Sequence, residues 1–256
     1  MKRMKFFGLC ALAVFAVAGF AASSAFASAP EFGRCVAKTK GKYATSSCTT
    51  TKAGTEKFEW EPGPGPKNGI HSVIKEKTTA TLETVKGTKI TCSGEESPGE
   101  FKNAKEVGGV IAKFNGCKTS GLPCNSAGAK AEEIVTAPLG GVLGVEKVST
   151  EGPVKNKLAL ELHSEAGNIA EFECSGVKIV VHGSVLHPVS ANKMLIQATE
   201  KFAATKGEQK PSFFAGEPED SHILESNTNG GPFEEAGQTI TAIAKYEEKI
   251  EANSVL

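Results

Sequence analysis

Apolar and polar residues alternate with a period of two along much of the chain. In the run KLALELH at 157–163, the three leucines fall on one face, and Glu161 and His163 fall on the other. The same alternation recurs at 79–85, 110–115, 177–185 and 238–246. A strand with one apolar face and one polar face covers a core on one side, which is typical of antiparallel sheets. Glycine and proline clusters separate these runs, so the sequence predicts an all-β protein, an antiparallel β-sandwich or barrel.

The sequence predicts three segments along the chain. Residues 1–27 are interpreted as a signal peptide, 28–69 as an N-terminal disulfide segment with a Pro/Gly linker, and 70–256 as the β domain. The small N-terminal segment is too short to bury a core of its own, so we expect it to pack on the β domain as a lid or an extra strand. One further stretch, SAGAKAEEIV at 126–135, fits a helix or a strand.

The first 27 residues have the composition of an export signal. Three positive charges in MKRMK precede the uncharged run FFGLCALAVFAVAGFAA at 6–22, and Ala25 and Ala27 then form an A-x-A site. This order predicts a secretory signal peptide cleaved after Ala27, with cleavage after Ala29 as an alternative that would leave Pro30 first. An uncleaved membrane anchor is the competing interpretation, although the apolar run is near the lower limit of roughly 17–25 residues needed to span a bilayer. We therefore expect a protein that is secreted or held at the cell surface, with no membrane span after cleavage.

Composition and charge narrow the class of partner. The chain has 29 basic and 29 acidic residues, and removal of residues 1–27 takes away three basic residues and no acidic one. A slightly acidic mature chain argues against a nucleic-acid partner. Arg34 is the one arginine that remains, which disfavours bidentate recognition of phosphate or carboxylate groups.

Six cysteines remain after Cys10 leaves with the signal peptide. They are Cys35, Cys48, Cys92, Cys117, Cys124 and Cys174. An even number in an exported protein predicts a disulfide set, for which six cysteines allow 15 pairings. Short spacing favours Cys35–Cys48 and Cys117–Cys124, and elimination then pairs Cys92 with Cys174. A zinc site is disfavoured because the sequence has no C-x-x-C pair.

Several segments of the mature chain form a set of recognisable motifs. They begin with PEFGRCV at 30–36 and KFEWEPG at 57–63, and continue through ATLETVKGTKITCSGEESPGEF, FNGC, SAGAKAEEIVTAPLGGVLG and GGPFEEAGQTI. Together these segments resemble an uncharacterised family of secreted actinobacterial proteins. The resemblance covers essentially the whole mature chain. The resemblance implies export and a shared fold, but it supplies no activity and no functional residue.

The sequence offers no catalytic residues and no cofactor site that we would assign. The G-x-S-x-G, H-E-x-x-H and phosphate-loop patterns are missing. The group Asp220-Ser221-His222 cannot form a Ser-His-Asp relay by itself, because adjacent residues on a strand point to opposite faces. We interpret it as a turn before the strand HILES. We therefore assign no catalytic, no cofactor-binding and no metal-binding residue.

Three kinds of side chain are weighed as weaker candidates. His163, His182 and His187 would suit zinc or copper, but we expect them to be exposed on polar strand faces. The doublets at 95–96, 132–133 and 234–235 would suit calcium, but solvated loop charge is the expected explanation. Trp60 would suit a sugar ring, but we favour a buried anchor for the N-terminal segment.

The sequence therefore favours an exported non-catalytic protein with a binding or structural role. Its partner would be an unknown ligand or a component of the cell envelope. A secreted hydrolase of unrecognised type is one alternative, and a cleft with converging His and Glu side chains would support it. A carrier of a small apolar ligand is another, and a closed barrel with an apolar interior would support that one. A flat face without a pocket would instead favour surface assembly.

Overall fold

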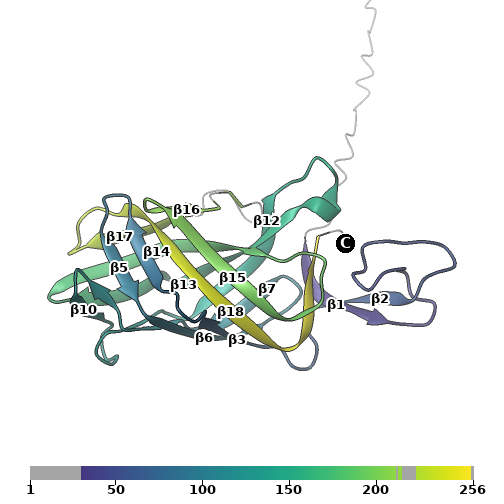
Figure 1. Cartoon of the computed structure of the whole chain (residues 1–256), viewed down its shortest axis with the longest axis horizontal. Helices are drawn as coiled ribbons and strands as arrows, with labels where there is room; N and C mark the ends of the chain where they lie inside the picture. Colours follow the sequence, from purple (N-terminus) through teal and green to yellow (C-terminus); the bar gives the residue numbers. More distant parts are fainter. Residues whose placement is uncertain (1–29, 212, 215–222, 255–256) are drawn as a thin grey trace, which may run out of the picture.

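The computed structural model describes residues 30–211, 213–214 and 223–254, and these residues are almost entirely β-structure (Figure 1). They contain one hydrogen-bonded sheet of 18 strands and a 3-10 turn at Pro153–Lys155. In chain order the strands are β1 (Glu31–Ala37), β2 (Phe58–Pro62), β3 (Gly69–Ile74), β4 (Ala80–Thr84), β5 (Lys89–Cys92), β6 (Gly94–Phe101), β7 (Glu106–Val110), β8 (Lys113–Asn115), β9 (Lys118–Thr119), β10 (Leu122–Asn125), β11 (Glu133–Val135), β12 (Leu139–Lys147), β13 (Lys157–Cys174), β14 (Val177–Val189), β15 (Leu195–Thr205), β16 (Glu208–Lys210), β17 (Leu224–Thr228) and β18 (Glu234–Asn253). The predicted all-β antiparallel fold is confirmed.

The sheet closes on itself. Starting at β18, antiparallel pairing runs through β3, β6, β7, β12, β13, β14 and β17, and β17 pairs again with β18. At one end of the molecule a second path leads from β18 through β4, β5, β9 and β10 to β13. Strands β8 and β11 pair with each other between these two paths, and β8 also pairs with β6. Of the two expected architectures, the structure is therefore the barrel.

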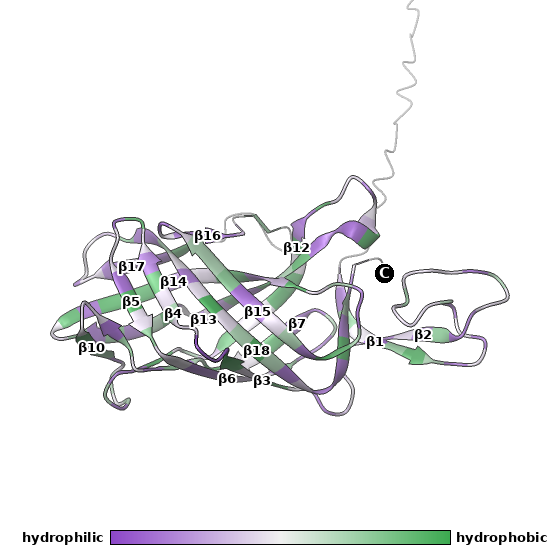
Figure 2. Ribbon diagram, viewed as in Figure 1, coloured by the Kyte–Doolittle hydropathy of each residue, from purple (hydrophilic) through white to green (hydrophobic). Residues whose placement is uncertain are grey.

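Hydrophobic and hydrophilic residues follow one another along the strands (Figure 2). The buried apolar residues of these strands form one core cluster, which the closed sheet surrounds. The three leucines of β13, at 158, 160 and 162, are all buried in the core. Glu161 lies on the opposite face, as expected, but only 13% of its side chain is exposed. Long stretches of β13, β14 and β18 carry this pattern because each is paired on both sides while one of its faces turns inward.

At one place in the closed sheet, a side chain rather than a backbone ladder connects neighbouring strands. The second half of β14 and the neighbouring β15 share no backbone ladder among the described residues. The amide of Gln209, on β16, spans this joint: its Oε1 accepts from the Leu186 N–H at 3.1 Å, and its Nε2 donates to the Ser184 carbonyl at 3.2 Å. These two hydrogen bonds satisfy backbone groups of β14 that have no strand beside them.

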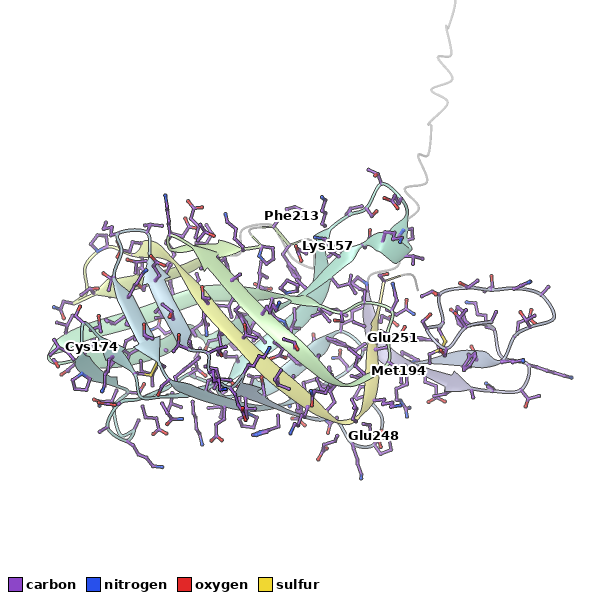
Figure 3. The ribbon with its side chains drawn as sticks, in the orientation of Figure 1. Lys157, Cys174, Met194, Phe213, Glu248 and Glu251 are labelled. Carbon is purple, nitrogen blue, oxygen red and sulfur yellow. A yellow bond between two sulfur atoms is a disulfide. The ribbon has the colours of Figure 1, made fainter. Side chains whose placement is uncertain are left out.

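Residues 30–62 form a small N-terminal lobe at one end of the closed sheet (Figure 1). Strand β1 pairs with β2 and also with the last residues of β18, where Phe32 faces Ala252. The segment therefore adds strands to the β domain. This is one of the two arrangements expected from the sequence, the other being a lid. Figure 3 places Met194 and Glu251 at the junction with the lobe, while Cys174 lies at the opposite end of the molecule.

Two local expectations can be compared with the structure. The stretch 126–135, which fitted a helix or a strand, is a turn that leads into the strand β11. The run 110–115 is not one strand, because β7 ends at Val110 and β8 begins at Lys113. The predicted signal peptide and its cleavage site lie outside the described residues.

Candidate functional site

A cavity of about 140 Å³ lies inside the closed sheet. Its walls come from strands on all sides of the barrel, and most of the side chains are apolar, including Leu82, Val110, Phe114, Leu162, Phe172 and Ile240. These residues face inward because they occupy every second position of their strands. The interior of this protein is therefore incompletely filled by its own side chains.

A smaller cavity of about 40 Å³ continues toward the N-terminal lobe. The two cavities share wall residues, among them Leu160, His187 and Glu200. Phe32 of β1 and Ala252 of β18 line the smaller one. The apolar space thus extends from the middle of the sheet to the junction with the lobe.

Four polar side chains gather on the wall of the larger cavity. Ser72 of β3 faces Ser97 of β6 directly across the ladder, and Glu95 lies two residues before Ser97. The Ser97 hydroxyl donates to Glu95 Oε1. The Ser72 hydroxyl donates to Glu200 Oε2, on β15, at 2.9 Å. Each serine hydroxyl is therefore hydrogen-bonded to one glutamate of the cavity wall.

Small residues of β18 make this arrangement possible. Ala244 faces both Ser72 and Ala198, while Ala242 faces Glu200. Both β18 alanines are buried, and their methyl groups leave space on the inner face for the longer side chain of Glu200. Glu200 can therefore reach across β18 to a serine on the next strand but one.

Among the described residues that line the larger cavity, Glu95 has the most strongly shifted pKa. Only 8% of the residue is exposed, and its Oε2 has no hydrogen-bond partner among the described residues. Burial raises the pKa of Glu95 to about 7, and the charges of Glu200 and Glu96 act in the same direction, while the Ser97 hydrogen bond opposes them. The expectation that the 95–96 doublet is solvated loop charge is wrong for Glu95. Both residues belong to β6, so alternation turns Glu95 inward and leaves Glu96 exposed.

The three histidines do not come together. His182 lies on the outer face, where its Nε2 is 2.9 Å from Glu225 Oε2 and its ring stacks on Phe233 at 3.7 Å. His163 is also on the outer face, with Nδ1 4.0 Å from Glu161 Oε2. His187 was expected to be exposed, but it is 4% exposed and lines the cavity next to Phe202. The spacing of five places His182 and His187 on opposite faces, and His187 is the one that turns inward.

The other weak candidates have structural roles or are not described. Glu234 pairs with Lys86 at 2.9 Å, which lowers the pKa of that carboxyl group. Trp60 faces Cys35 across the β1–β2 ladder and packs in the lobe, where it is partly buried. Its ring lies over Gly33, where an added Cβ would be 2.4 Å from Trp60 Cζ2. Asp220, Ser221 and His222 lie outside the described residues.

The structure forms three disulfides, and two of them differ from the expected pairing. Cys35 is joined to Cys48, Cys92 to Cys117, and Cys124 to Cys174. The expected bonds Cys117–Cys124 and Cys92–Cys174 are therefore wrong. The last four cysteines lie in one row across β5, β9, β10 and β13, in the order 92, 117, 124, 174.

The register explains this pairing. Cys117 and Cys124 do face each other across a hairpin, but in a hydrogen-bonded position, where the Cys124 N–H donates to the Cys117 carbonyl at 2.9 Å. Facing residues of an antiparallel pair come closer in the positions without backbone hydrogen bonds. Each of the two cysteines therefore bonds to its neighbour on the other side, where the Cα atoms are 4.0 Å apart.

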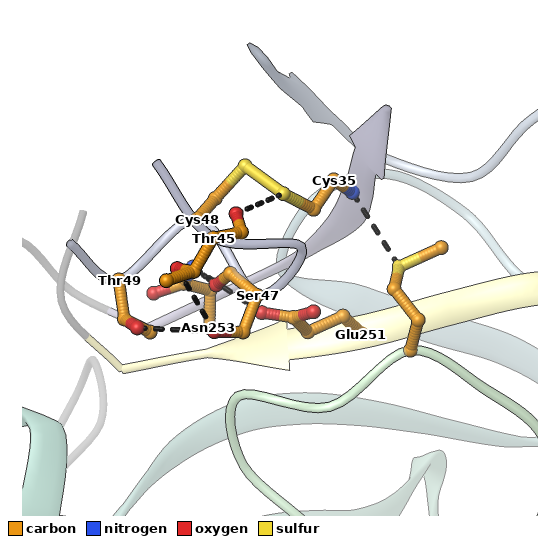
Figure 4. Close-up of a disulfide and its surroundings, with 8 residues drawn as sticks. Cys35, Thr45, Ser47, Cys48, Thr49, Glu251 and Asn253 are labelled. Atoms are coloured by element: carbon orange, nitrogen blue, oxygen red, sulfur yellow. Dashed lines mark hydrogen bonds between the residues drawn. A yellow bond between two sulfur atoms is a disulfide. The ribbon is translucent and has the colours of Figure 1, made fainter. Parts of the chain in front are cut away.

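A second buried acid lies where the lobe meets the sheet (Figure 4). Glu251 of β18 is 1% exposed, and burial raises the pKa of its carboxyl group to about 8. Asn253 Nδ2 lies 3.4 Å from Glu251 Oε1 and 3.3 Å from the Ser47 carbonyl. This acid is enclosed by the lobe and does not line the larger cavity.

Within the described ranges, no three His, Cys, Asp or Glu side chains are grouped so that they would hold a metal ion. The described residues also contain no helix that is both long and apolar enough to cross a membrane. Comparison with known proteins gave no match to any protein-family model, any curated protein or any solved structure.

Sequence reasoning did not single out Ser72, Ser97 or Glu200. A signal for Glu200 exists in LIQATEKFAAT at 195–205, where it shares the period-two face of Ala198 and Phe202. A glutamate between apolar residues on the same face indicates an acid that turns toward the core.

Proposed function

We propose that this protein is a non-catalytic binding protein that encloses one small apolar molecule inside its closed sheet. The observation that carries the proposal is the cavity of about 140 Å³ with mostly apolar walls. An apolar cavity of roughly 150 Å³ in another protein is large enough for benzene. A ligand, or the part of it that enters the cavity, is therefore expected to be about the size of one aromatic ring.

We further propose that the protein works outside the cytoplasm, secreted or attached to the cell envelope. The three disulfides support this, because such bonds form and persist in oxidising environments. The predicted signal peptide supports it from the sequence alone.

A secreted hydrolase is the second candidate, because Glu95, Ser97, Glu200 and His187 all line one cavity and the pKa of Glu95 is raised. A serine nucleophile needs a base that accepts its proton, and Ser97 donates to Glu95. Hydrolysis of small phenyl esters by the wild type, lost in Ser97→Ala, would support this candidate. Equal rates in the two proteins would leave binding as the function.

The binding proposal is tested by titrating ethylbenzene into the protein with isothermal calorimetry. We expect saturable binding of one molecule per chain. Ala170→Leu adds bulk to a cavity wall and should abolish the heat of binding. Ala203→Leu makes the same change at an exposed position of β15 and should bind as the wild type does. Absence of binding to the wild type, or equal binding to Ala170→Leu, would contradict the proposal.

A further inference from the structure

The polar groups of the larger cavity are acidic and lie together on its wall. Glu95 and Glu200 are close enough for the charge of Glu200 to raise the pKa of Glu95. Ser72 and Ser97, which face each other across the β3–β6 ladder, each occupy one oxygen of one glutamate. Among the described residues that line the larger cavity there is no lysine and no arginine, while Lys193 lines the smaller cavity together with Glu200. Within the larger cavity, the described residues therefore offer these acids no lysine or arginine as a counter-charge.

One carboxylate oxygen of this group has no hydrogen-bond donor among the described residues. Glu95 Oε2 is buried and has no hydrogen-bond partner among the described residues. Glu95 nevertheless lines the cavity, where a ligand can contact it. A buried acceptor without a donor destabilises the protein, and a buried carboxylate does so more than a neutral group. A ligand that donates to this oxygen would remove that penalty on binding.

Among the described titratable groups around the two cavities, none is hydrogen-bonded to Glu95 Oε2. His187, from β14, packs against Phe202, and its Nδ1 lies 3.3 Å from the Pro188 carbonyl. Tyr246, from β18, lines the smaller cavity, and burial together with Glu200 raises the pKa of its hydroxyl group. Glu96 belongs to the outer face of β6.

We infer that the ligand of this cavity is an apolar molecule with a basic nitrogen, whose ammonium group binds between Glu95 and Glu200. This inference rests on the proposed binding function. An ammonium group carries three donors and a single positive charge, so it donates to Glu95 Oε2 and to Glu200 at once. A hydroxyl group donates only one hydrogen and leaves the charge of the carboxylates unbalanced, and an anionic ligand is repelled by them. The apolar walls take the rest of the molecule.

Benzylamine and ethylbenzene provide a matched pair of probes, since they differ only in a terminal ammonium or methyl group. In calorimetric titrations at pH 8, we expect the wild type to bind benzylamine about tenfold or more tightly than ethylbenzene, as is typical of a buried charged hydrogen bond. Glu95→Gln should reduce this preference to within about twofold. Glu200→Gln is a second variant with the same expected result. Glu96→Gln removes the same charge from the exposed neighbour and should change neither affinity.

The outcomes separate this inference from the proposed function. If the wild type binds neither probe, the binding function itself fails. If it binds ethylbenzene as tightly as benzylamine, the function stands and the basic-nitrogen inference is overturned. Equal affinity for benzyl alcohol and benzylamine overturns it as well, because a neutral donor then suffices. Equal loss of benzylamine affinity in Glu96→Gln also overturns it, since surface charge would explain the preference.

Discussion

The closed sheet and the N-terminal lobe bury their residues in very different ways. The sheet surrounds a continuous apolar cluster to which nearly all of its strands contribute. In the lobe, the buried cluster consists of Cys35, Tyr43 and Cys48, with Phe58, Trp60 and Met194 packed against it. A cluster of this size stabilises little by hydrophobic burial, so the lobe depends on its disulfide and on pairing with β18.

Both regions contain a buried glutamate with a raised pKa and an oxygen without a partner, Glu95 in the sheet and Glu251 at the lobe junction. Their surroundings differ. Glu95 borders the larger cavity, whereas Glu251 is covered by the lobe, with Asn253 and Ser47 next to it (Figure 4). On our proposal the same chemical group binds a ligand in one region, and in the other we expect it to make the packing of the two parts pH-dependent.

The largest expected effect comes from Glu251. A carboxyl group whose pKa is raised on folding binds more protons in the folded than in the unfolded protein between the two pKa values, so stability falls as the pH rises through that interval. For Glu251 the interval runs from 4.5 to about 8. The loss is about 5 kcal/mol at most. We expect Glu251→Gln to be more stable than the wild type at pH 9 and equally stable at pH 4.5, in urea unfolding followed by Trp60 fluorescence.

Trp60 is the one tryptophan of the chain and belongs to the lobe, so its fluorescence reports on that region. Glu247→Gln is the control, because Glu247 is an exposed residue of the same strand. Glu95→Gln should give a smaller gain of about 3 kcal/mol, which grows as the pH rises from 4.5 through about 7, and it should appear in the circular dichroism of the sheet. An equal gain at pH 4.5 and pH 9 would contradict the assignment to carboxyl ionisation.

The second prediction compares two disulfides. In the chain-entropy model, Cys124–Cys174, with a sequence separation of 50, stabilises by about 4 kcal/mol, and Cys35–Cys48, with a separation of 13, by about 3 kcal/mol. Replacing Cys124 and Cys174 together by alanine should lower the urea midpoint of the circular dichroism signal. Replacing Cys35 and Cys48 together should lower the midpoint of Trp60 fluorescence and leave the circular dichroism almost unchanged. If each double variant moves both signals equally, the lobe and the sheet unfold as one unit and the comparison fails.

The sequence predicts the part of this fold that depends on local pattern. Alternation identifies β13, β14, β18 and β4, because each strand buries one face and period two is the direct result. It does not decide which strands are neighbours, so closure of the sheet could not be predicted. The disulfide pairing fails for the same reason: Cys117 and Cys124 are near each other as spacing suggests, but register determines which of them can bond.

The candidate site depends even more on register. Ser72, Glu95 and Glu200 are separated by long stretches of sequence, and they meet because β3, β6, β18 and β15 pair in one particular alignment. Glu95 itself is in a short polar run, SGEESPG, that has the composition of a loop. The structure makes it a strand because its backbone pairs with β3 and β8, and neighbouring strands can impose extended structure on a sequence of low strand propensity.

The smallest expected effect concerns the ligand, and it tests whether the two regions respond separately. A ligand that binds only the folded sheet stabilises it by about 1.4 kcal/mol at ten times its dissociation constant, which corresponds to an increase of roughly half a molar in the urea midpoint. Ethylbenzene at that concentration should raise the circular dichroism midpoint of the wild type and not that of Ala170→Leu. Trp60 fluorescence should keep its midpoint, because the larger cavity is lined by the sheet and not by the lobe. An equal rise in the fluorescence midpoint would instead place the ligand in the smaller cavity, where Phe32 of β1 and Ala252 of β18 meet, and would make the lobe part of the binding site.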